Sequence, residues 1–419
     1  MVVGTKKNTV IDLFAGCGGL SLGLYQAGWE GLFAIEKNPF AFETLKHNLI
    51  DNKKHFNWPE WLPQTAHEIN EVLDKYPDQL KALRGQVDLV AGGPPCQGFS
   101  MAGKREENDT RNQLVFSYIK FIELVKPKMI LFENVKGFTY AFDKGKTEAE
   151  AEPYSHKVIS QLEELGYDVK AQVIDFSQYG VPQRRKRFIL VGILKELGSP
   201  NQFVEMLNTN KDAFLKDRGL STTTTLKEAI SDLLRSNGKE PTPDRKGFES
   251  GVYGYGKLTN YEILMRGDYP NSHAVPDSHS FAHHTQGKVD CFKKLLSDYP
   301  ERGKRIDGKN RAKWDIKQRG ITVLDPSSVS PTITGQPDDY LHYSEPRIMT
   351  VRECARIQSF PDWFEIKKKY TTGGKMRKIE VPRYSQIGNA IPPLFAEQAG
   401  FVLKQMLEHG NEGQSEISC

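Results

Sequence analysis

The chain has 419 residues, of which 38% are hydrophobic and 26% charged, and its formal net charge is +4. This length predicts two or three domains at roughly 150 residues per domain. The composition excludes a disordered chain, and no apolar run approaches the roughly 20 residues that span a bilayer. The small net charge excludes binding of a polyanion by bulk charge alone, so a nucleic-acid partner would have to meet local basic patches.

Short apolar runs that are typical of buried strands recur through the first half of the chain. They lie at 10–14, 32–35, 87–91, 129–132, 169–174 and 188–193. Helix-like stretches between several of them lie at 19–27, 40–49, 114–125 and 155–165. This alternation predicts an α/β fold with a doubly wound, mostly parallel sheet covered on both faces. The last two strands are close enough in sequence to form a hairpin instead.

The sequence becomes polar and rich in Gly, Pro, Ser and Thr after residue 193, with no clear alternation until about residue 320. This region predicts a second domain or a large insertion. Within it, residues 301–319 carry eight positive and three negative side chains, a local charge of 8 − 3 = +5. The stretch is either a solvated surface or a surface that faces phosphates. Helix-like segments follow from 346 and over 393–406.

A glycine-rich turn follows the first strand, in the segment DLFAGCGG that starts at Asp12. Gly16, Gly18 and Gly19 allow a tight turn and close approach of a ligand. The second strand ends at Glu36, where an acidic side chain can accept hydrogen bonds from ribose hydroxyls. The turn lacks the lysine of a P-loop and the full GxGxxG spacing, which favours a nucleoside cofactor without pyrophosphate, such as S-adenosylmethionine. The alternative is a turn that serves helix packing only.

A cysteine follows two prolines in the segment GGPPCQGFS, at the carboxyl end of the third apolar run. Cys96 therefore lies at the sheet edge where ligands bind, and Glu133 ends the next strand at the same edge. Thiolate addition to carbon 6 of cytosine activates carbon 5 toward a methyl sulfonium, and a carboxylic acid at ring N3 stabilises the developing charge. The arginines and lysine of residues 183–187 can supply positive charge that favours the thiolate.

The five cysteines are Cys17, Cys96, Cys291, Cys354 and Cys419, an odd number without a CxxC pair. They predict neither a disulfide framework nor a zinc site, so we expect no metal. A reducing compartment fits them best. The amino terminus also lacks an apolar signal core, so we expect a cytoplasmic protein.

Six motifs in order resemble those of bacterial DNA (cytosine-5)-methyltransferases of the type II restriction-modification kind. They are DLFAGCGG, GGPPCQGFS, ENV, QRRKR, ITVLDPSSVSPTITG with TVRECARIQSFPD, and QIGNAIPP. The resemblance implies transfer of a methyl group from S-adenosyl-L-methionine to carbon 5 of a cytosine in a short double-stranded DNA sequence. It also implies base flipping, protection of host DNA from a cognate restriction endonuclease, and a monomer without membrane contact.

The same resemblance implies the domain organisation. The expected fold is a Rossmann-like methyltransferase sheet with a reversed last strand, plus a smaller target-recognition domain. Residues 1–195 and 384–419 would form the catalytic domain. Residues 196–383 would form the target-recognition domain, with its variable part at about 196–320.

The resemblance assigns roles by motif. Cys96 would be the nucleophile and Glu133 the residue that binds N3, while Arg185 and Arg187 would contact the flipped cytosine and the DNA backbone. The residues expected to bind the cofactor are Asp12, Phe14, Gly16, Gly18, Gly19, Glu36, Glu68, Ile69, Pro94 and Asn389. The residues expected to bind DNA are Gln97, Ser100, Arg105 and Arg111.

Two positions depart from the family pattern. Glu68 stands where the family commonly has Asp in the contact to the adenine amino group. Lys37 stands where an apolar or aromatic residue often packs on adenine. The motif therefore does not supply the usual residue for stacking on adenine.

Three other functions have sequence signatures of their own. The main RNA cytosine-5 family uses a Thr-Cys motif that is absent here, whereas the tRNA-methylating branch shares the DNA-type motifs and stays open. A DNA-binding regulator without catalysis is disfavoured because Cys96, Glu133, Arg185 and Arg187 are all present. Amino-group methylation needs no covalent activation, and the chain has no Pro-Pro-aromatic motif.

Overall fold

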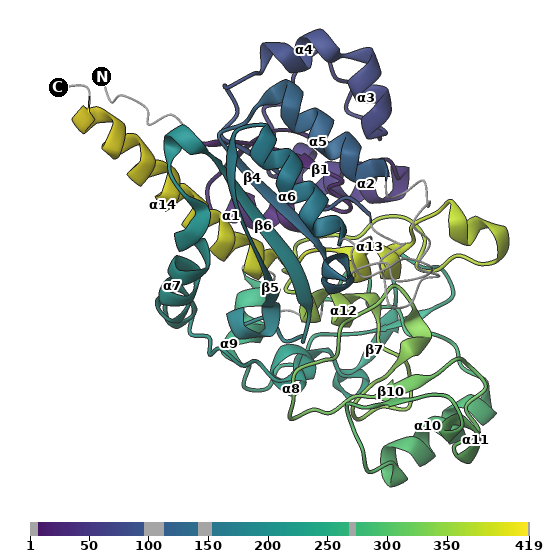
Figure 1. The fold of residues 1–419 in the computed structure, drawn as a ribbon. Coiled ribbons are helices and arrows are strands. Elements are labelled where there is room, and N and C mark those ends of the chain that lie inside the picture. The colour runs from purple at the N-terminus through teal and green to yellow at the C-terminus, as the bar shows by residue number, and fades with distance from the viewer. Residues whose placement is uncertain (1–6, 96–112, 141–152, 268–273, 418–419) are drawn as a thin grey trace. The chain divides into compact units, whose positions relative to one another are not determined.

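The computed structural model describes residues 7–95, 113–140, 153–267 and 274–417 (Figure 1). The chain divides into two compact units. The first unit comprises Met1–Asp175, Lys186–Lys211 and Ala396–Cys419, and the second comprises Phe176–Arg185 and Asp212–Phe395. Each unit is therefore built from segments that are far apart in the sequence. Which unit reads the DNA sequence stays a prediction.

The first unit contains a six-stranded sheet in the order β2-β1-β3-β4-β6-β5 (Figure 1). Its strands are β1 (Thr9–Leu13), β2 (Glu30–Ile35), β3 (Leu89–Gly92), β4 (Met129–Val135), β5 (Tyr167–Asp175) and β6 (Lys186–Leu194). Neighbouring strands from β2 to β4 are parallel, whereas β6 is antiparallel to both β4 and β5. The predicted α/β fold, with its mostly parallel sheet and reversed last strand, is confirmed. The hairpin of the last two strands is also present.

Helices cover both faces of this sheet. On one face, Leu73, Leu80, Phe121 and Leu162 come from four helices and join one core with the strands. Side chains alternate along a strand, so Asp12 points away from this core, and it contacts Ser21 of α1 (Gly19–Gln26) on the other face. The remaining helices of this part are α2 (Pro39–Leu45), α3 (Ile69–Lys75), α4 (Pro77–Ala82), α5 (Gln113–Val125) and α6 (Tyr154–Glu164). Helix α7 (Phe203–Asp217) begins in the first unit, and its residues after Lys211 belong to the second. A π-helical turn, η1 (Lys46–Asn52), follows α2, and 3₁₀ turns lie at η3 (Lys136–Thr139), η5 (Lys195–Leu197) and η6 (Pro200–Gln202).

Local sequence explains where two of these elements begin and dock. Asn38 caps α2, because its side-chain oxygen accepts a hydrogen bond from the Phe40 amide at 3.0 Å, and Pro39 occupies the first helical position. The last helix, α14 (Pro393–Ile417), continues beyond residue 406, where the expected helix ended. Trp29 donates its indole N–H to the carbonyl of Gly400 in α14 at 3.0 Å. None of the described helices is long and apolar enough to cross a membrane.

The second unit has small sheets and short helices. Strand β10 (Ile321–Val323) pairs antiparallel with β9 (Arg305–Ile306) and parallel with β11 (Tyr340–Leu341), while β7 (Lys239–Pro241) pairs antiparallel with β8 (Glu249–Gly251). The helices are α8 (Leu226–Ile230), α9 (Asn260–Arg266), α10 (Gln286–Asp298), α11 (Asn310–Lys313), α12 (Val351–Ile357) and α13 (Arg383–Asn389). The 3₁₀ turns are η4 (Phe176–Tyr179), η7 (Ser231–Leu233), η8 (Arg235–Asn237), η9 (Pro337–Asp339) and η10 (Gly374–Lys378).

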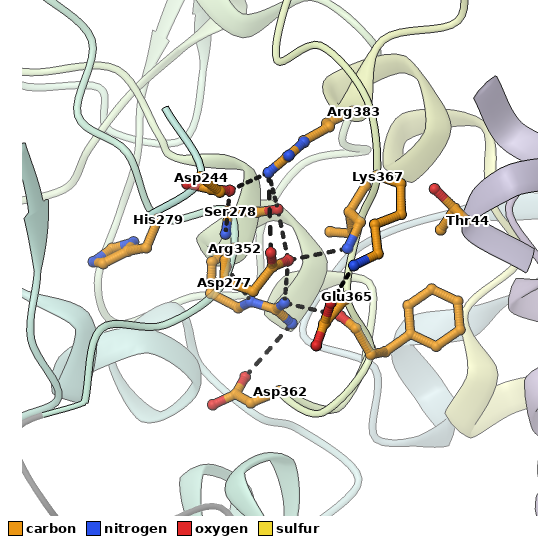
Figure 2. Close-up of polar contacts among 12 residues, drawn as sticks. Thr44, Asp244, Asp277, Ser278, His279, Arg352, Asp362, Glu365, Lys367 and Arg383 are labelled. Carbon is orange, nitrogen blue, oxygen red and sulfur yellow. Dashed lines mark hydrogen bonds and ion pairs between the residues drawn. The ribbon is translucent and has the colours of Figure 1, made fainter. Parts of the chain in front are cut away.

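Arginines of the TVRECARIQSFPD motif hold this unit together from inside. Arg356 of α12 is fully buried and pairs with Asp362 at 2.6 Å and with Asp232 at 3.1 Å. Figure 2 shows Arg352, from the same helix, between Asp277 and Asp362. Buried charges need such partners, because removal of one partner leaves the other desolvated. The motif therefore organises the core of the second unit.

Candidate active site

The turn between β1 and α1 contains left-handed backbone conformations, which favour glycine. Gly16 and Gly18 have φ values of 58° and 95°, and Phe14 between strand and turn has 59°. A Cβ at Gly18 would lie 3.0 Å from the Leu49 side chain, so a larger residue would also crowd that leucine. A Cβ at Gly16 would meet no atom within 4 Å. Gly16 therefore borders open space, as a position that a ligand approaches should.

Glu36 lies at the end of β2 and is fixed by backbone amides. Its Oε2 atom accepts from the amide of Gly16 at 2.8 Å, and its Oε1 atom accepts from the amide of Asn38 at 2.7 Å. Burial raises the pKa of Glu36, and the two amide hydrogen bonds oppose that rise. Because a carboxylate oxygen can accept more than one hydrogen bond, both oxygens keep capacity for ribose hydroxyls.

Asp12 is a buried carboxyl group beneath α1. Its Oδ2 atom accepts a hydrogen bond from the Ser21 hydroxyl, whereas its Oδ1 atom has no hydrogen-bond partner among the described residues. Desolvation by burial raises its pKa to about 7, and the charge of Glu36 adds to the rise. An unsatisfied buried acceptor next to a glycine turn is a feature that a bound donor group would relieve.

The two positions that depart from the family pattern contact each other. Lys37 forms an ion pair with Glu68, with 3.1 Å between Nζ and Oε1, and 70% of the lysine side chain is exposed. The amide of His67 donates to the carbonyl of Glu36 at 2.9 Å, which joins the two segments. Ile69 follows as the first, buried residue of α3. Lys37 thus interacts with the carboxylate expected at the adenine amino group.

These residues fit an adenosine-containing cofactor. Gly16 and Gly18 follow β1, and Glu36 follows β2. Glu68 comes directly after His67, whose amide donates to the carbonyl of Glu36. Ligands of open parallel sheets bind at these carboxyl ends of the strands. Gly19 starts α1 within the same unit, whereas Asn389 is the last residue of α13 in the second unit.

Glu133 and Arg187 form an ion pair on neighbouring antiparallel strands. The Nε atom of Arg187 lies 2.9 Å from Oε1 of Glu133, and only 14% and 15% of the two side chains are exposed. Burial lowers the pKa of Arg187, while the charge of Glu133 opposes this. A Cβ at Gly93 would lie 2.8 Å from Oε2 of Glu133, so the glycine makes room for the carboxylate next to the strand that leads to the predicted nucleophile.

Two residues of this edge were not predicted as site residues. Asn134 donates from its side-chain amide to the carbonyl of Pro94 at 3.2 Å, and its side-chain oxygen accepts from the amide of Val135. Asn134 therefore fixes the Pro-Pro segment to the end of β4, while Gly93 admits Glu133. Both residues could have been predicted from the motifs GGPPCQGFS and ENV. A glycine before a rigid turn leaves room for a neighbouring side chain, and an amide beside a carboxylate can hydrogen-bond the backbone.

Arg185 behaves differently from Arg187, although only one residue separates them. It is buried in the second unit and donates to the carbonyls of Ile333 at 3.2 Å and Gly388 at 3.0 Å. Gln183 supports the same junction, since its side chain donates to that of Gln358 at 2.7 Å and accepts from the amide of Ile333. These bonds join three of the motifs within one unit, a role that motif matching did not indicate. Cys96, Gln97, Ser100, Arg105 and Arg111 lie outside the described residues.

Comparison with known proteins identifies the family. The family model for C-5 cytosine-specific DNA methylases matches residues 8–405. Type II methyltransferase M.XorII of Xanthomonas oryzae pv. oryzae is 31% identical, over 97% of this chain and 87% of its own. M.DdeI of Desulfomicrobium norvegicum is 30% identical, over 93% and 86%. A solved E. coli structure described as a DNA modification methyltransferase encoded within a prophage shares the fold, with a TM-score of 0.65, 23% identity, and coverage of 96% of this chain and 100% of that one. The chain belongs to the C-5 cytosine-specific DNA methylases, and it is a DNA (cytosine-5)-methyltransferase of the type II restriction-modification kind that uses S-adenosyl-L-methionine.

Proposed function

We propose that the protein methylates one cytosine within a short double-stranded DNA sequence, by covalent catalysis on a base that has left the helix. The observation that carries this proposal is the Glu133–Arg187 pair, held at the carboxyl end of β4 beside Gly93. Strand β3 ends at the same edge and leads through the Pro-Pro segment to Cys96. A stacked cytosine exposes neither face to a thiolate, so the base has to flip.

The proposed reaction balances as an addition followed by an elimination. The Cys96 thiolate forms a bond to carbon 6, and Glu133 hydrogen-bonds at N3, where negative charge develops. Bound S-adenosyl-L-methionine supplies the methyl group to carbon 5 and leaves as S-adenosylhomocysteine. Loss of the carbon 5 proton to a base then breaks the carbon–sulfur bond and releases the thiolate. Arg187 keeps the carboxyl group of Glu133 oriented and adds positive charge near the ring.

The cofactor would occupy the turn after β1. Glu36 would accept from the ribose hydroxyls and Glu68 from the adenine amino group, with Phe14, Gly16 and Gly18 shaping the turn. Their positions support this assignment, because all belong to the first unit. They lie at the ends of β1 and β2 or, for Glu68, next to the residue whose amide donates to the carbonyl of Glu36. Arg187 would lie beside the flipped cytosine, because it pairs with Glu133, which binds N3 of the base. Arg185 would act indirectly, by fixing the turn that precedes β6.

Bisulfite sequencing of DNA from a host that expresses the protein tests the proposal. We expect a single short motif to be methylated at one cytosine, and fully unmethylated DNA would contradict the proposal. The variant Cys96→Ser should lose methylation and still bind S-adenosylhomocysteine, whereas a fully active serine variant would exclude the covalent step. Methyl transfer to tRNA but not to DNA would favour the tRNA-methylating alternative. The proposed physiological role is protection of cytoplasmic DNA from a cognate endonuclease.

A further inference from the structure

We propose that four exposed cations of the second unit, Lys309, Lys313, Lys317 and Arg319, form a surface that binds the phosphate backbone of duplex DNA. This inference rests on the proposed function, which supplies the duplex. It concerns the basic stretch 301–319, whose eight positive side chains fall into three groups. Three arginines anchor the segment, Lys304 pairs with Glu301, and the four named here face solvent.

Three arginines of the stretch are structural. Arg302 donates to the carbonyls of Tyr343 and Leu296, each at 2.7 Å. Arg311 donates to the carbonyl of Gln318 at 2.6 Å, and Arg305 pairs with Asp339 at 3.0 Å. Their guanidinium groups are therefore engaged in holding the segment in place.

A tryptophan fixes the segment to the adjoining helix. Trp314 lies edge-on to Tyr299, with 5.5 Å between the ring centroids, and its carbonyl accepts from the Cys291 thiol at 3.4 Å. Trp314 also packs against the core that contains Phe292 and Ile316. Helices α10 and α11 accordingly lie next to each other (Figure 1). The cations project from a folded platform rather than from a loose loop.

The remaining positive charges are not neutralised locally. Lys304 pairs with Glu301 at 2.7 Å, whereas Lys309, Lys313, Lys317 and Arg319 are exposed and form no ion pair with any residue that the structure describes. Two carboxylates of the stretch, Asp307 and Asp315, are exposed as well. The four cations outnumber them, so the surface keeps a positive excess. Solvent-exposed lysines without partners lose little when they approach phosphates, because release of condensed counterions favours binding. An acidic protein partner would need apolar anchors, and every large exposed hydrophobic side chain among the described residues lies outside 301–319.

The salt dependence of duplex binding tests this surface. A fluorescently labelled duplex that carries the methylated motif is titrated with full-length protein in about 50–300 mM KCl, with S-adenosylhomocysteine present. The variant Lys309→Gln/Lys313→Gln/Lys317→Gln/Arg319→Gln should bind more weakly and lower the slope of log K against log[salt] by about 2 to 3.6, at about 0.9 for each phosphate that the protein no longer neutralises. Its melting temperature and its affinity for S-adenosylhomocysteine should match the wild type.

The matched control removes four exposed lysines elsewhere, in the variant Lys120→Gln/Lys170→Gln/Lys216→Gln/Lys227→Gln. This control should keep the wild-type slope, which separates a local surface from a general loss of charge. A wild-type slope in the 309–319 variant, or equal losses in both variants, would overturn the inference. If the wild-type protein neither binds duplex DNA nor methylates it, the proposed function fails instead. Arg302→Gln should lower the melting temperature, as expected for an anchor.

Discussion

Arg187 and Arg185 belong to the same five-letter motif, yet they lie in different units and in different environments. Arg187 pairs with one partly exposed carboxylate at the edge of the large sheet. Arg185 is enclosed and donates to the main-chain carbonyls of Ile333 and Gly388. The first unit leaves charged groups at its strand ends with hydrogen-bonding capacity for a ligand, whereas the second unit uses many of its arginines internally. A motif thus identifies residues that matter without saying which of them touch substrate.

The largest expected effect is on the stability of the second unit. Arg356→Met should lower the free energy of unfolding by about 3–5 kcal/mol, because Asp362 and Asp232 would lose a buried partner. Urea unfolding followed by circular dichroism measures this. The control Lys304→Met breaks an exposed ion pair and should leave the midpoint unchanged. Equal midpoints for both variants would show that the buried arginines do not hold the unit together.

The second prediction concerns the first unit. Glu133→Gln should reduce kcat for DNA methylation by about 10²–10⁴-fold, because the amide keeps the shape of the side chain but loses its acid–base chemistry at N3. Binding of S-adenosylhomocysteine should be unaffected. Glu123→Gln, an exposed change on α5, serves as the control and should keep full activity. An active Glu133→Gln enzyme would contradict the assigned role.

The third prediction is a pH dependence of stability caused by Asp12. Its folded-state pKa of about 7 lies above the usual 3.8 of aspartate, so the folded protein binds the proton more tightly than the unfolded chain. Stability from this group should therefore fall by up to about 1.4 kcal/mol per pH unit between about pH 4 and 7. Asp12→Asn has no such titration. The variant should gain stability relative to the wild type as pH rises, and a constant difference between pH 4 and 8 would argue against a raised pKa.

The smallest expected effect is at the exposed Lys37–Glu68 pair. Exposed ion pairs contribute about 0–1 kcal/mol, so Lys37→Met should change the affinity for S-adenosylhomocysteine by about fivefold at most. Isothermal titration calorimetry of both proteins at low and high salt measures the difference. A much larger loss would mean that Lys37 contacts the cofactor directly.

Sequence reasoning predicted the first unit better than the second. The strands of the large sheet are apolar runs with helices between them, so periodicity was enough to find them. Helices α8 and α9 are too short for a clear apolar period. Their capping boxes were readable, since Thr225 with Glu228 and Thr259 with Glu262 follow the Thr-x-x-Glu pattern.

The site was predictable only where its residues are close in sequence or end neighbouring strands. Glu36 could be assigned from its position after the second strand, because sheet geometry brings it to the glycine turn. The partners of Arg185 could not, since Ile333 and Gly388 lie 148 and 203 residues further along the chain. Such contacts depend on tertiary packing that no local pattern encodes.

The amide-held carboxylate of Glu36 has a consequence for selectivity among the many adenosine compounds of a cell. With the proposed ribose contact, each carboxylate oxygen is oriented by one backbone N–H and cannot turn away from the sugar. A phosphate on the 2′ or 3′ hydroxyl, as in NADP or coenzyme A, would place negative charge against a buried acid. Such molecules should therefore bind weakly because of the ribose phosphate alone, whatever group is attached at the 5′ position. The cofactor site would thereby discriminate by charge as well as by shape.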